Sequence, residues 1–116
     1  MKYIKEYYKH SENNIDNLEL YDYVISDVKL SDDKMTYYLQ NNIGQLVKIT
    51  EDDFLYNVRY IAPDFDLSSY PLSWFTTVVI DKINYINMPL EPREIKYWSK
   101  DKSDLELVLN INKYNL

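Results

Sequence analysis

Apolar and polar side chains alternate with a period of two through residues 23–50. The clearest example is Met35, Tyr37 and Leu39, which alternate with Thr36 and Gln40. Alternation of this kind, between clusters of turn residues, is typical of an antiparallel meander. The pattern predicts three strands at residues 23–30, 35–40 and 46–49, separated by polar breaks at 31–34 and 41–44.

The second break ends at Gly44, which is the only glycine of the chain. A tight hairpin turn requires a residue with positive φ, and glycine adopts that conformation without a steric penalty. The position of Gly44 between two strand patterns therefore predicts a hairpin there.

The remaining segments are expected to alternate between short helices, strands and one long loop. Spacings of three and four predict a helical segment at residues 1–11 and a helical turn at 54–61, for which a strand is the competing interpretation. The pattern at residues 15–20 is ambiguous, although it fits a second helical turn. A β-branched and aromatic run predicts a central strand, and period-two patterns predict two later ones. The predicted strands are 74–80, 94–99 and 105–112, with an interruption at 88–92 and a proline-bracketed loop at 62–71.

These elements predict one globular domain spanning residues 1–116. The predicted class is α+β with mostly antiparallel strands, either a small sheet or a partly open barrel with one or two short helices. No segment predicts a helix of crossover length between two buried parallel strands, so a βαβ unit is not expected.

The charge of the chain is concentrated in its middle. The net charge is −6, and residues 11–66 carry a net −8 while residues 67–116 are neutral. Phosphate binding requires clustered Lys and Arg, so direct nucleic-acid binding is not expected. A face rich in carboxylates favours a basic protein partner, although solubility alone also explains an acidic surface.

The residue inventory restricts the chemistry that is expected. One glycine is too few for a phosphate-cradling loop, and the chain has no cysteine and a single histidine, His10. The pair Asp64 and Asp66 offers oxygen ligands for a hard cation, but solvated turn carboxylates are the commoner explanation. The sequence therefore predicts a protein that is not an enzyme and has no metal or cofactor.

Three acidic clusters in predicted connections, together with aromatic neighbours, suggest a protein interface instead. Connections are where binding residues concentrate, and tyrosine offers a large contact area with a polar tip. The competing interpretation is that the acids solubilise the surface and the tyrosines pack in the core. The candidate partner-binding residues are Asp32, Asp33, Tyr37, Tyr38, Glu51, Asp52, Asp53, Asp64, Phe65, Asp66 and Tyr70.

Among these, Asp64 and Asp66 are expected to be the central contacts. Turn chemistry explains Asp32 and Asp33, and the start of a helix explains the acids at 51–53. No local structural role is evident for Asp64 and Asp66, which lie in the longest predicted loop.

In composition, the chain resembles two groups of small, acidic, cysteine-free proteins from AT-rich genes. One is the immunity proteins that neutralise bacterial toxins, often nucleases, and this resemblance implies a cytoplasmic inhibitor of a basic protein. The other is phage-encoded inhibitors of host defence, of the anti-CRISPR or anti-restriction type, some of which mimic DNA. A small metal-dependent hydrolase is the third interpretation. The sequence contains no run of about 18 apolar residues, so no membrane span is predicted. A homo-oligomer is compatible with every interpretation.

Overall fold

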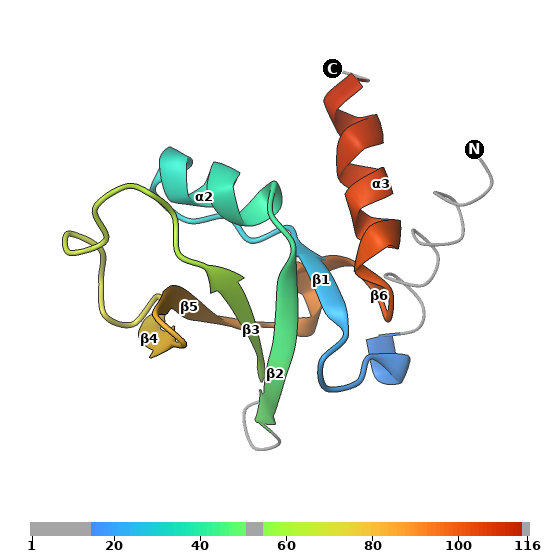
Figure 1. Ribbon diagram of the computed structural model, residues 1–116, viewed down its shortest axis with the longest axis horizontal. Coiled ribbons are helices and arrows are strands. Elements are labelled where there is room, and N and C mark those ends of the chain that lie inside the picture. Colours follow the sequence, from blue (N-terminus) through green and yellow to red (C-terminus); the bar gives the residue numbers. More distant parts are fainter. Residues whose placement is uncertain (1–14, 51–54, 115–116) are drawn as a thin grey trace.

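The structure is a computed structural model that describes residues 15–50 and 55–114, and its centre is a six-stranded sheet (Figure 1). The strand order is β4-β5-β3-β2-β1-β6, and every neighbouring pair is antiparallel. The sheet is open, with β4 and β6 at its two edges, which confirms the predicted α+β class. The strands are β1 (Tyr23–Ser26), β2 (Gly44–Thr50), β3 (Leu55–Ile61), β4 (Thr76–Ile80), β5 (Ile83–Leu90) and β6 (Ile95–Ser99).

Two α-helices of the described chain lie on opposite faces of the sheet. They are α2 (Asp33–Gln40) and α3 (Lys102–Tyr114), and two single 3-10 turns, η1 (Ile15–Asn17) and η2 (Pro92–Glu94), complete the elements. Successive strand residues point to opposite faces. Val24 belongs to the main core with α2, whereas its neighbour Ile25 packs with Leu105 and Val108 of α3.

The predicted middle strand of the meander is wrong, because residues 33–40 form α2. Asp32 is the N-cap of this helix, and its carboxylate accepts the backbone N–H of Met35 at 2.8 Å. Met35 and Leu39 are fully buried, but Tyr37 is 71% exposed. Residues i and i+4 lie on one face in a helix and also in a strand, so these two apolar positions fit both periods.

The predicted hairpin at Gly44 is also wrong, because this glycine is the first residue of β2 and does not have a positive φ. Its role is close approach of β3. A Cβ atom added to Gly44 would lie 2.3 Å from Val58 Cγ1 and 2.8 Å from Tyr60 Cζ. Glycine is required here by packing and not by backbone conformation.

The last predicted strand, at residues 105–112, is α3. Asp101 directly precedes this helix, and its carboxylate accepts the backbone N–H of Ser103 at 3.1 Å. Leu105 and Val108 are buried at a helical spacing of three, whereas Leu107 is 43% exposed. The run of alternating leucines therefore predicted the wrong period.

Residues 55–61 form the strand β3, so the favoured helical turn is wrong and the competing strand interpretation is confirmed. The predicted interruption at 88–92 is wrong at its start, because β5 continues through Pro89 to Leu90. Pro89 pairs with Asn57 on β3, whereas the pairing of β4 with β5 extends only as far as Asn87. The N–H group that proline lacks is therefore not needed for a hydrogen bond to β4.

The strand predicted at 94–99 and the loop predicted at 62–71 are confirmed, as β6 and as the connection between β3 and β4. The strand predicted at 74–80 exists as β4, but it is an edge strand and not a central one. The helix predicted at residues 1–11 lies outside the described residues.

Candidate functional site

The start of α2 and the loop 62–75 form one continuous surface. Tyr70 Oη donates a hydrogen bond to Asp32 Oδ2 at 2.9 Å, across 38 residues of chain. The Phe65 ring packs edge-on against the rings of Tyr38 and Tyr70, with centroid distances of 6.1 and 6.3 Å. We call this region the α2–loop surface. It brings together four predicted binding residues that lie far apart in the sequence.

Aromatic contacts also hold the second half of this loop. Tyr70 stacks on Trp74 with a centroid distance of 5.6 Å and contacts Phe75 edge-on at 6.2 Å. Phe75 is 8% exposed and joins the main core. The loop therefore contains its own aromatic packing and is anchored to the sheet, as in a compact Ω-type loop.

Asp32 has a structural role that the sequence did not reveal. The backbone N–H of Met35 lowers the pKa of its carboxyl, and the hydrogen bond from Tyr70 lowers it further. Asp33 follows in the first turn of α2, where its charge complements the helix dipole, and it is exposed. The prediction of a hairpin turn at these two acids is wrong, and of the two only Asp33 has a carboxylate without a hydrogen bond to the described residues.

The two acids of the loop differ in the same way. Asp66 Oδ1 accepts the backbone N–H of Ser68 at 2.9 Å, and this hydrogen bond lowers its pKa. The expectation that Asp66 has no local structural role is therefore wrong. Asp64 is exposed and makes no hydrogen bond or ion pair to the described residues. Its charge raises the pKa of Tyr38, after the larger effect of burial.

Tyr37 and Tyr38 are neighbours in sequence but have opposite surroundings. Tyr37 lies on the outer face of α2, four residues after Asp33, and is 71% exposed. Tyr38 turns toward the sheet, and its hydroxyl donates to the carbonyl oxygen of Ile61. Tyr37 is thus the more accessible tyrosine of this pair.

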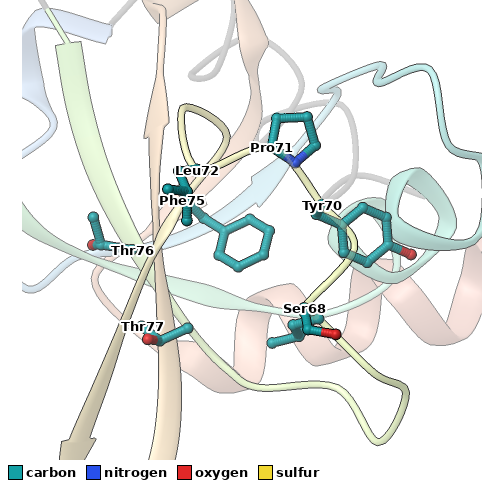
Figure 2. A pocket seen from close by; sticks show the side chains of 8 residues that line it. Ser68, Tyr70, Pro71, Leu72, Phe75, Thr76 and Thr77 are labelled. Atoms are coloured by element: carbon teal, nitrogen blue, oxygen red, sulfur yellow. The ribbon is translucent and has the colours of Figure 1, made fainter.

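A hollow of about 510 Å³ opens beside the α2–loop surface (Figure 2). Figure 2 shows the Phe75 ring between Tyr70 and the start of β4. Three aliphatic hydroxyl side chains, those of Ser68, Thr76 and Thr77, accompany the apolar walls. The lining residues are Leu67, Ser68, Tyr70, Pro71, Leu72, Phe75, Thr76 and Thr77. A hollow of this size and composition accommodates an aromatic or branched aliphatic side chain.

Most of these lining residues were missed by sequence reasoning, which named only Tyr70 among them as a candidate binding residue. One signal was present in the sequence. Residues 67–80 contain no Asp, Glu, Lys, Arg or His, in a chain of which 28% is charged. A long uncharged stretch that begins in a loop marks an apolar surface.

The third acidic cluster, Glu51, Asp52 and Asp53, lies outside the described residues. Within the described ranges, no group of three His, Cys, Asp or Glu side chains is arranged to hold a metal ion. No helix among the described residues has the length and apolar character needed to cross a membrane.

Comparisons of the chain with models of protein families, with curated proteins and with solved structures found no match.

Proposed function

We propose that this chain is a small acidic binding protein that neutralises a basic partner protein through the α2–loop surface. The observation that carries the proposal is the position of the apolar hollow on the same loop as the exposed carboxylates of Asp64 and Asp66. A buried apolar anchor surrounded by charged groups is the usual anatomy of a specific protein interface.

In this proposal the hollow takes an aromatic or aliphatic side chain of the partner. Asp64 and Asp66 lie at the other end of the same loop, and Asp33 and Tyr37 extend the surface along α2. Lys or Arg side chains beside the partner's anchor would pair with these carboxylates. Lys34, whose Nζ lies 4.5 Å from the Phe65 ring centroid, limits the acidic area on this side.

Within this function we favour an immunity protein that neutralises a bacterial toxin, such as a nuclease, in the cytoplasm. A nuclease has a basic substrate-binding face, and an acidic inhibitor associates with it rapidly because of electrostatic steering. A phage-encoded inhibitor of host defence would use the same surface, so the identity of the captured partner distinguishes the two.

Mimicry of DNA is the less favoured version of that alternative. It needs carboxylates in rows that are free to replace phosphates. Glu19 and Asp22 are instead both bound to Lys100, with Nζ–O distances of 2.8 and 3.3 Å. Asp32 is occupied by the N-cap of α2 and by Tyr70.

The experiment compares three forms of the protein as baits in extracts of the source cell. The test variant is D64N/D66N, and the matched control is D81N/E106Q, which removes the same charge from exposed carboxylates outside the α2–loop surface. The amide that replaces the Asp66 carboxylate retains a side-chain oxygen for the Ser68 N–H, so the loop conformation and the melting temperature are expected to stay unchanged.

The proposal requires a basic protein that binds the parent and the control but binds D64N/D66N more than tenfold more weakly. The purified partner's activity must also be inhibited by the parent. If both double variants weaken binding equally, net charge alone explains the loss of affinity and the α2–loop surface is not the contact. Unchanged binding by D64N/D66N would also refute the assigned surface.

A further inference from the structure

The outer edge of β4 has no protection against strand pairing in the described part of the chain. β4 pairs with β5 alone, and all five of its residues are β-branched: Thr76, Thr77, Val78, Val79 and Ile80. Edge strands are usually guarded by charged residues, proline or bulges. The opposite edge, β6, carries the exposed Lys96 and pairs with β1 across an irregular register.

The hairpin geometry shows which backbone groups of β4 face outward. Asp81 and Lys82 form a two-residue turn with φ of 50° and 69°, which is the type I′ conformation of tight hairpins. Residues that flank such a turn, here Ile80 and Ile83, form a hydrogen-bonded pair, and these pairs alternate along the ladder. The N–H and C=O groups of Thr77 and Val79 therefore point away from β5.

We propose that a second copy of this chain adds its own β4 antiparallel to this edge, around a two-fold axis at Val78. In this register Thr77 of each copy lies opposite Val79 of the other. Each of these two pairs exchanges both backbone hydrogen bonds, so four bonds form. The two copies of Val78 then face each other as a non-hydrogen-bonded pair.

Charge favours a second copy over a basic partner at this edge. Two chains of net charge −6 repel each other over most of their surface. Residues 67–80 carry no ionisable group other than Tyr70, so the β4 edges bring no like charges into direct contact. A basic protein gains nothing from this neutral strip and is drawn to the carboxylates of the α2–loop surface.

Apolar burial supports the same occupant. Val79 is an apolar residue that is 65% exposed, whereas the preceding Val78 is half-buried. Antiparallel partners point to the same face, so each Val79 would be covered by Thr77 of the other copy on the α2 face. The dimer would therefore place both α2–loop surfaces on one side of a continuous sheet.

Single cysteines test the register cleanly because the chain has no cysteine of its own. At a non-hydrogen-bonded pair the Cα atoms are about 4.5 Å apart, within the range that a disulfide spans. V78C should therefore form a covalent dimer under mild oxidation. The matched control is T76C on the same face of β4, whose two copies would be about 14 Å apart.

The expected result is at least tenfold more disulfide-linked dimer for V78C than for T76C on non-reducing gels. Sedimentation of the parent over a range of concentrations should show a reversible dimer. V79K should raise its dissociation constant at least tenfold, although the added lysine lowers the net repulsion between copies. D64N/D66N should not weaken the dimer, because it removes negative charge outside the β4 edge, and this separates the test from that of the proposed function.

Three results would overturn the proposal. The first is a parent protein that sediments as a monomer at every concentration, including the case in which the edge instead captures a strand of another protein. The second is equal cross-linking of V78C and T76C. The third is a dimer that V79K does not weaken, which would place the contact elsewhere.

Discussion

Replacing Gly44 with alanine tests the close approach of β2 and β3 directly. The new Cβ would lie 2.3 Å from Val58 Cγ1, and 2.8 and 2.9 Å from two ring atoms of Tyr60. Both neighbours are buried, with exposures of 0% and 1%, so neither has room to move away. Overpacking of this kind costs about 1–3 kcal/mol, and three short contacts place Gly44→Ala at the upper end.

The backbone gives a smaller contribution of opposite sign. Alanine loses less conformational entropy than glycine on folding, which stabilises the variant by about 0.5–1 kcal/mol. The net expectation is a destabilisation of about 2 kcal/mol, or a decrease of roughly 8 °C in melting temperature for a domain of this size. Urea titration followed by the fluorescence of Trp74 and Trp98 measures the free energy of unfolding.

A double-mutant cycle identifies the cause. Val58→Ala alone should cost about 2 kcal/mol because it leaves a cavity, but it also removes the atom nearest the new Cβ. We therefore expect G44A/V58A to be more stable than the sum of its parts by at least about 1 kcal/mol. In the control cycle the second site is Leu90, which faces Tyr56, about 13 Å along β3 from Tyr60, and the effects should add. Parent-like stability of G44A, or strict additivity with V58A, would refute the packing explanation.

Two matched pairs of variants and one single variant test the helices and the β4–β5 turn. Leu107→Gln should change the free energy of unfolding by less than about 0.5 kcal/mol, whereas Val108→Gln should cost about 3 kcal/mol or more, since only Val108 is buried; urea titration giving the reverse order would support a strand at 105–112. Asp32→Ala should lower the melting temperature by a few degrees more than Asp33→Ala does. Because the folded-state pKa of Asp32 lies below its ordinary value of 3.8, this difference should be fully present above pH 3.8 and disappear as the pH falls through the folded-state pKa, and a difference that stays constant down to pH 2 would contradict it. Lys82→Gly should raise the thermal stability by about 0.5 kcal/mol in a calorimetric melt, because Lys82 has a φ of 69°, and a lower melting temperature would contradict the turn geometry.

The sequence predicted the class of the fold but assigned three elements to the wrong period. At α2, the positions of Met35 and Leu39 satisfy both the helical and the strand spacing. Only their packing against the sheet, which local sequence does not reveal, decides between the two. At α3, the alternating leucines hide the helical pair Leu105 and Val108. β3 was the reverse case, where tertiary pairing with β2 and β5 outweighs a helical spacing.

The candidate site was predicted in part. Two prolines and the unusual length marked the loop, and the structure confirms that the loop exists. The contact between Tyr70 and Asp32 joins residues that are distant in sequence, so no local pattern could reveal it. The hollow was missed because half of its wall belongs to residues 72–77, which lie beyond the predicted loop and mostly in the strand predicted at 74–80.

The pairing of β1 with β6 has a consequence for the order in which the chain folds. Val24 lies opposite Trp98, so this ladder closes a loop that contains all the other strands of the described chain, whereas β4 and β5 are joined by two residues. Closing a long loop costs chain entropy before any contact compensates for it. Assembly should therefore begin at the β4–β5 hairpin and the β2–β3 pair. The unit formed by β6 and α3 would then be added late, when Ile25 is already in place to receive Tyr97, Leu105 and Val108.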